Sequence, residues 1–211
     1  MRFIIHEQPF ERIVAAGQYR YEQAGSPTGA LEHWRLTAVS APYHVLRVDL
    51  DGRSASGNSY LYHLTLGENG RPERLQYRFW NDKLTISGNV LLDPGMVTAT
   101  RVVDGRSHEE HITLPTAYGF AFPAVTGLGW LARQMGERER GTAVFLDPAV
   151  DQPESAFKLL VTDLTLEHGA ALTLRWPAQA RTLWLDEQGW PVRMEREGLT
   201  AVVVWHIAYG G

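Results

Sequence analysis

Apolar and polar side chains alternate along most of this chain with a period of two residues. In the stretch 31–39, LEHWRLTAV, Trp34 and Leu36 fall on one face, while His33 and Arg35 fall on the other. Alternation of this kind is typical of a β-strand that is buried on one face. The chain is therefore predicted to consist mainly of strands.

Turn signals divide the alternating pattern into short segments. The clearest is Asn69-Gly70, because these residues accept the positive backbone φ angles of a tight hairpin turn. Asp104-Gly105 and Asp51-Gly52 are similar signals. Roughly eight strands precede residue 114, with turns about ten residues apart. This spacing predicts an all-β, mainly antiparallel protein whose large sheet curls into a half barrel or barrel.

The segment Leu114–Gly136, LPTAYGFAFPAVTGLGWLARQMG, interrupts the alternation and is apolar on every side of a helical projection. Such a segment is either buried against a sheet or presents apolar surface to a ligand or partner. Pro123 suits the first position of a helix, and Gly136 suits its end. A short or bent helix from Pro123 to Met135 is therefore predicted.

Two glycines inside this helix, Gly127 and Gly129, each weaken it by roughly 1 kcal/mol relative to alanine. We interpret them as loosening the helix. The expectation is a loosely helical plug that covers the open side of the curled sheet and admits a ligand.

Composition narrows the classes of function. The 211 residues are expected to form one domain, 1–211, and the net charge of -4 argues against binding to nucleic acid. The absence of cysteine excludes disulfides and thiolate chemistry. At the amino terminus only Phe3, Ile4 and Ile5 precede charged residues, so no signal peptide or membrane span is predicted. The expected location is the cytoplasm.

Residues suited to catalysis or metal binding form no recognisable motif. His108 and His111 are separated by two glutamates, and on a strand they point to opposite faces. No GxSxG, phosphate-binding loop or dinucleotide fingerprint occurs. No metal or cofactor is therefore predicted, and the sequence favours a protein that is not an enzyme.

Four arginines, Arg35, Arg47, Arg78 and Arg101, fall in successive predicted strands. A row of arginines is able to clamp an anionic group. Because they alternate with apolar neighbours, we assign them instead to the solvated face of the sheet.

The other face of the sheet is rich in large aromatic residues, which suit either a solid core or the lining of a cavity. Together with the apolar helix they are the candidate ligand-binding residues: Trp34, Tyr62, Tyr77, Phe79, Phe120, Phe122, Leu128, Trp130 and Trp184.

The carboxy-terminal run 182–205, TLWLDEQGWPVRMEREGLTAVVVW, predicts strands joined by turns. It resembles the closing meander of the lipoprotein-carrier-like superfamily, in which a curled antiparallel sheet is plugged by a short apolar helix. The resemblance implies an apolar cavity between sheet and helix that holds an acyl chain or another lipid. This chain departs from the secreted members because no signal peptide is predicted and it contains no cysteine that could carry a lipid.

The expected function is non-enzymatic binding or carriage of a hydrophobic small molecule or lipid. One alternative is an interaction or structural module that docks through the apolar segment, with a homodimer as one form of it. Another is a barrel enzyme that acts on a small molecule.

Overall fold

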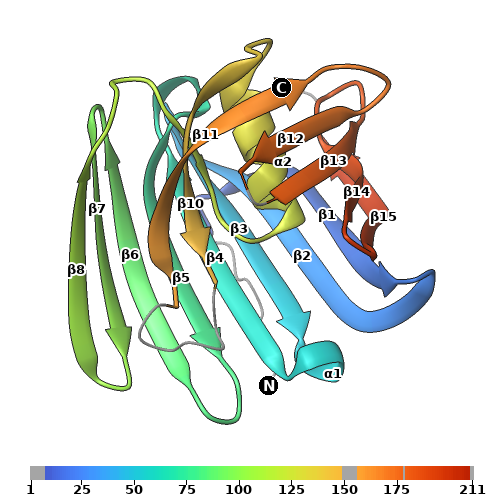
Figure 1. The fold of residues 1–211 in the computed structure, drawn as a ribbon, viewed down its shortest axis with the longest axis horizontal. Helices are drawn as coiled ribbons and strands as arrows, with labels where there is room; N and C mark the ends of the chain where they lie inside the picture. The colour runs from blue at the N-terminus through green and yellow to red at the C-terminus, as the bar shows by residue number, and fades with distance from the viewer. Residues whose placement is uncertain (1–7, 149–155, 178, 210–211) are drawn as a thin grey trace.

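The computed structural model describes residues 8–148, 156–177 and 179–209, and all strands in this part of the chain belong to one sheet. The sheet has 15 strands in the order β8-β7-β6-β5-β4-β3-β2-β1-β15-β14-β13-β12-β11-β10-β9. Neighbouring strands are antiparallel except for β9 and β10, which are parallel. The prediction of a mainly antiparallel curled sheet with a short helix is confirmed (Figure 1). The residues that suggested a cytoplasmic location, Phe3 to Ile5, lie outside the described part.

In the described chain eight strands precede the segment 114–136, the short β9 lies within it and six strands follow it. The first group is β1 (Arg12–Gln23), β2 (Ser26–Ser40), β3 (Tyr43–Gly52), the helical turn α1 (Arg53–Ser56), β4 (Asn58–Leu66), the 3-10 turn η1 (Glu68–Gly70), β5 (Pro72–Trp80), β6 (Thr85–Asp93), β7 (Met96–Val103) and β8 (Arg106–Thr113). The second is β9 (Gly119–Ala121), α2 (Val125–Met135), β10 (Arg140–Asp147), β11 (Lys158–Glu167), β12 (Leu172–Trp176), β13 (Gln179–Leu185), β14 (Pro191–Arg196) and β15 (Leu199–Ala208).

The sheet curls around α2, which lies in its hollow (Figure 1). We call the face toward α2 the inner face and the opposite one the outer face. The two edge strands are β8 and β9. The edge of β9 is covered by Gln134 of α2, whose amide accepts from the Phe120 N–H at 3.0 Å and donates to the Phe120 carbonyl at 2.9 Å. The helix therefore completes the hydrogen bonding of the strand that precedes it.

The helix begins two residues later than predicted. Ala124 has an extended backbone and precedes the first helical residue, and Gly136 ends the helix with φ 58°. Nine residues of α2 are buried, including Val125 and Leu131, which have no exposed surface. The all-round apolar pattern of this segment therefore reflects burial on all sides.

A buried carboxylate holds the start of α2. Glu32 projects from the inner face of β2 and has no exposed surface. It accepts hydrogen bonds from the backbone N–H groups of Val125 and Thr126, both at 2.9 Å, and from the hydroxyls of Thr126 and Tyr21, both at 2.5 Å. It takes the place of an N-cap side chain, which Ala124 cannot supply.

The helix glycines allow close packing, contrary to the expectation that they loosen the helix. A β-carbon at Gly129 would lie 2.5 Å from the Pro191 ring on β14, and one at Gly127 would overlap the carbonyl oxygen of Phe122. Real β-carbons do not approach this closely, so neither position has room for alanine. The lower helix propensity of glycine is outweighed by the contacts that its small size permits.

We expect Gly127→Ala to destabilise the protein by about 1–2 kcal/mol, because the overlap with backbone outweighs the gain of roughly 1 kcal/mol in helix propensity. Urea unfolding followed by tryptophan fluorescence measures this. The matched control is Gly169→Ala, where the nearest atom lies 3.7 Å away and little change is expected. A Gly127→Ala protein more stable than the wild type would show that the helix is loosely packed.

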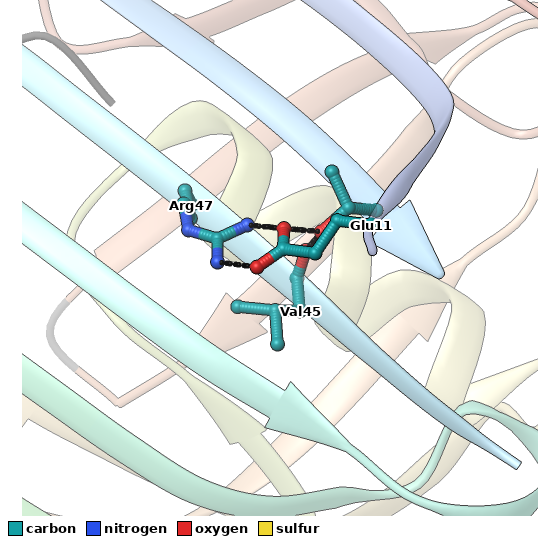
Figure 2. A network of polar contacts seen from close by, with 4 residues as sticks. Glu11, Val45 and Arg47 are labelled. Carbon is teal, nitrogen blue, oxygen red and sulfur yellow. Dashed lines mark hydrogen bonds and ion pairs between the residues drawn. The ribbon is translucent and has the colours of Figure 1, made fainter. Parts of the chain in front are cut away.

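The assignment of four arginines to the solvated face is wrong for two of them. Arg47 lies on the outer face but is 9% exposed, because Glu11 crosses above it and accepts two hydrogen bonds of 2.6 Å from its guanidinium group (Figure 2). The hydroxyl of Thr37 donates to the same carboxylate at 2.8 Å. Arg101 lies on the inner face, 5% exposed, and pairs with Glu110. Alternation cannot reveal that Glu11 covers Arg47, whereas Arg101 shares the parity of the buried Ala99 and Val103 on β7.

Candidate functional site

Eight of the nine predicted ligand-binding residues are buried in one hydrophobic core. They are Trp34, Tyr62, Tyr77, Phe79, Phe120, Phe122, Leu128 and Trp130. None of the eight is more than 8% exposed. The structure therefore brings them to the inner face, where little of each side chain is exposed.

The aromatic centre of the inner face is filled by a residue that the sequence analysis did not single out. Phe157 precedes β11 with φ 59° and is 1% exposed. Its ring lies 4.9 Å from that of Tyr77 and 5.6 Å from that of Phe79. Phe122 similarly contacts Tyr62, with ring centres 4.7 Å apart. This group of rings is packed core.

Trp34 belongs to a second aromatic group, next to the carboxy-terminal strands. It stacks on Trp190 with ring centres 4.2 Å apart, and a β-carbon at Gly17 would overlap its indole ring. The guanidinium group of Arg133 lies over the ring of Trp190, 4.2 Å from its centre. It lies 5.5 Å from the ring centre of Trp130. This stack fixes the side of α2 that carries Trp130 and Arg133.

The placement of Trp184 on the inner face is wrong. On β13 the buried inner residue is Leu183, which has no exposed surface, and Trp184 lies on the outer face, paired with Arg193 of β14. The guanidinium group of Arg193 lies 5.2 Å from the Trp184 ring. Residues 183–185 are all apolar, so alternation could not decide which of them points inward.

A groove open to solvent lies at the carboxy-terminal half of α2 and has a volume of about 570 Å³. It is lined by the β4–β5 turn (69–72), by Leu92 of β6, by the loop 116–118, and by residues of β9 and α2. Of the nine predicted residues, Phe120 and Trp130 line it. The groove was not predicted, since its lining comes from segments far apart in the sequence.

Specific contacts hold the walls of this groove. The Trp130 indole donates to the Gly70 carbonyl at 3.3 Å, which ties α2 to the predicted Asn-Gly turn, where Asn69 has φ 56° and Gly70 has φ 70°. The Tyr118 hydroxyl donates to the Asp93 carbonyl at 2.9 Å. Burial raises the pKa of Tyr118 to about 12, so it keeps its proton at neutral pH.

The groove is basic although the whole chain is acidic. Arg71, Arg133 and Arg138 line it, and no acidic residue of the described chain does. Arg133 is held in place by the carbonyl groups of Gln188 and Gly189. Burial lowers the pKa of Arg133, but an arginine stays charged at neutral pH.

A second open hollow, of about 510 Å³, lies between the turns at 24–25 and 195–200. Its charged residues are Glu195, Arg196 and Glu197, so both signs of charge are present. None of the predicted residues lines it. We therefore regard the groove beside α2 as the candidate site.

The histidines at 108 and 111 point to opposite faces of β8, as predicted. His108 pairs in register with the buried Arg101, whereas His111 is exposed and lies 3.3 Å from Glu109. Within the described residues, no three His, Cys, Asp or Glu side chains gather closely enough to hold a metal ion. No helix in the described part of the chain is both long and apolar enough to cross a membrane.

No protein-family model matches the chain, and no curated protein does. One similar solved structure is a beta-barrel-like protein of the domain of unknown function DUF1849 from Brucella abortus. It is 8% identical, with 94% of this chain and 99% of that chain aligned and a TM-score of 0.46.

Proposed function

We propose that this protein is a non-enzymatic binding protein for a hydrophobic small molecule, such as an acyl chain or another lipid, held in the groove beside α2. The observation that supports this is the groove itself. Its volume of about 570 Å³ falls within the roughly 300–1,000 Å³ typical of small-molecule sites. Its apolar lining includes Pro72, Leu92, Tyr118 and Trp130.

The position of this ligand differs from the one that the lipoprotein-carrier-like resemblance implies. That resemblance would put an acyl chain between the sheet and the helix, where here Gly129 meets Pro191 and the inner aromatic rings contact one another. The groove at the end of α2 is reached from solvent without moving the helix. A ligand bound there would contact Trp130, which is 7% exposed.

The polar groups of the groove support binding rather than catalysis. The lining contains arginine, asparagine, glutamine, threonine and tyrosine, but no histidine, carboxylate or lysine among the described residues. General acid–base catalysis needs a group whose pKa lies near the working pH. Arginine remains protonated, and the pKa of Tyr118 is about 12, so neither provides such a group at neutral pH.

The test is binding of an environment-sensitive fatty-acid probe, together with native mass spectrometry of the protein mixed with palmitic acid. We expect one molecule to bind, and Ala117→Trp, which places a bulky ring in the groove, to weaken binding by about tenfold or more. Ala55→Trp, on the exposed turn α1, is the matched control and should bind as the wild type does. A wild-type protein that binds neither ligand would overturn the proposal.

A second candidate function, association with another copy, is favoured by a different surface. The outer face of β15 and the residue after it expose Val204, Trp205, Ile207 and Tyr209 to between 40% and 52%. Side chains of this kind are enriched at protein interfaces. The apolar side chains of α2 itself are buried and offer no such surface. Sedimentation at micromolar concentration distinguishes the two, because association is required by the second candidate and not by the first.

A further inference from the structure

We infer that the ligand of this groove is an amphiphile with an anionic head group, a carboxylate or a phosphate, which Arg71 and Arg138 bind at the rim. This inference rests on the proposed function and adds the chemical class of the ligand. It predicts that charge at one end of the ligand, and not its apolar chain alone, determines affinity.

Positive charge is concentrated in the groove. The chain has 24 acidic and 20 basic residues, so a random patch of its surface should contain both signs. The described lining of the groove instead contains three arginines and no acid. A concave site lined by one sign of charge raises the local concentration of ligands of the opposite sign.

Two arginines of the groove are available to a ligand. Elsewhere in the described chain six of the arginines form ion pairs with carboxylates: Arg20, Arg47, Arg53, Arg101, Arg175 and Arg193. Arg71 and Arg138 are exposed and form no ion pair or side-chain hydrogen bond with the described residues. Their planar groups of N–H donors are free to bind an anion in a bidentate manner.

Arg133 has a fixed position at the groove. Its stacking on Trp190 and its hydrogen bonds to the 188–189 turn hold its charge there. The amide of Gln134 is already bound to the backbone of Phe120. The head group is therefore assigned to Arg71 and Arg138, with Arg133 adding a fixed positive charge.

Displacement of the neutral probe N-phenyl-1-naphthylamine tests this inference with three competitors of equal chain length: palmitate, hexadecyl phosphate and hexadecanol. We expect the two anions to bind the wild type about tenfold or more tightly than the alcohol. Arg71→Gln/Arg138→Gln should bring the anions close to the alcohol and leave the alcohol unchanged. Arg78→Gln/Arg175→Gln, which removes two arginines outside the groove, should retain the preference.

The outcomes separate the two levels of the proposal. Whichever anion binds more tightly identifies the head group, and a preference for either one supports the inference. Equal binding of all three competitors to the wild type overturns the anionic head group. A preference for the anions that survives Arg71→Gln/Arg138→Gln overturns the assignment of the head group to these two arginines. Either result leaves the proposed function standing. If neither the probe nor any competitor binds, the proposed function fails together with the inference.

Discussion

Replacing Glu32 with alanine should destabilise the protein by about 3–5 kcal/mol, because four buried donors then lose their acceptor. Two of them are the backbone N–H groups that begin α2, at Val125 and Thr126, and two are the hydroxyls of Thr126 and Tyr21. These donors are shielded from bulk water, since Glu32 has no exposed surface. The cost should appear in urea unfolding and as faster hydrogen exchange at the start of α2.

The matched control is Glu109→Ala, since the Glu109 side chain on β8 is 58% exposed and should contribute less than about 1 kcal/mol. If Glu32→Ala does not fold, Glu32→Gln gives the same information. Glutamine keeps one acceptor oxygen but turns an NH₂ group toward donors, so an intermediate loss is expected. A Glu32→Gln protein as stable as the wild type, with unchanged hydrogen exchange in α2, would contradict this account of how the helix is held.

The stability difference between wild type and Glu32→Gln should also depend on pH. Burial raises the pKa of Glu32 above its ordinary value of 4.5, against the lowering effect of its hydrogen bonds from Thr126 and Tyr21. A raised pKa in the folded state means that the contribution of Glu32 is full below 4.5 and is lost as the pH rises through the raised pKa. The stability difference between wild type and Glu32→Gln should therefore shrink as the pH rises.

Replacing Glu11 with glutamine should destabilise the protein by about 3 kcal/mol, because Arg47 would keep its charge in a buried site without its carboxylate. The Arg47 side chain is 10% exposed and that of Glu11 is 3% exposed. Urea unfolding measures the loss. The control is Glu167→Gln, which breaks an ion pair that is more than half exposed on both sides and should change stability by less than about 1 kcal/mol.

The pH dependence of Glu11 has the opposite sign to that of Glu32. Burial raises the pKa of Glu11, but the hydrogen bonds from Arg47 and Thr37 outweigh it and hold the pKa below 4.5. The contribution of Glu11 is therefore full above 4.5 and is lost as the pH falls through the lowered pKa. The difference between wild type and Glu11→Gln should be largest at neutral pH and shrink in acid, and a constant difference would contradict the pairing.

Local pattern was sufficient to predict the strands and their turns. The face on which a residue such as Trp34 lies can be predicted from the residues two positions away. The Asn69-Gly70 turn can be predicted because these two residues accept positive φ angles. The apolar helix was also recognisable. Its start was misplaced because the cap, Glu32, lies 93 residues before Val125 and acts across space.

The burial of Glu32 could have been predicted from its position in β2. It has the same parity as Trp34 and Leu36 on β2, so the alternation places an acid among inner, apolar positions. A carboxylate at such a position needs buried donors, and the start of a helix supplies them. Following the parity of every polar residue would have predicted that Glu32 is buried on the inner face.

The candidate site could not be predicted from the local pattern of the sequence. The groove joins the 69–72 turn, the 116–118 loop and the end of α2, and which turns approach that helix depends on how far the sheet curls. Phe157 was missed for a related reason, since nothing near it in the sequence indicates that it fills the aromatic centre. The apolar segment Leu114–Gly136 contains the packed helix α2, whose carboxy-terminal half forms one side of the groove.

The most direct test of ligand binding in this groove is photo-crosslinking with a fatty acid that carries a diazirine midway along its chain, mapped by mass spectrometry after irradiation. The groove account predicts labels on its lining, at Leu92, Tyr118 and Trp130. Labels concentrated in the interior at Phe79 and Phe157, or on the outer face at Trp205, would contradict it, as would a protein that takes no label.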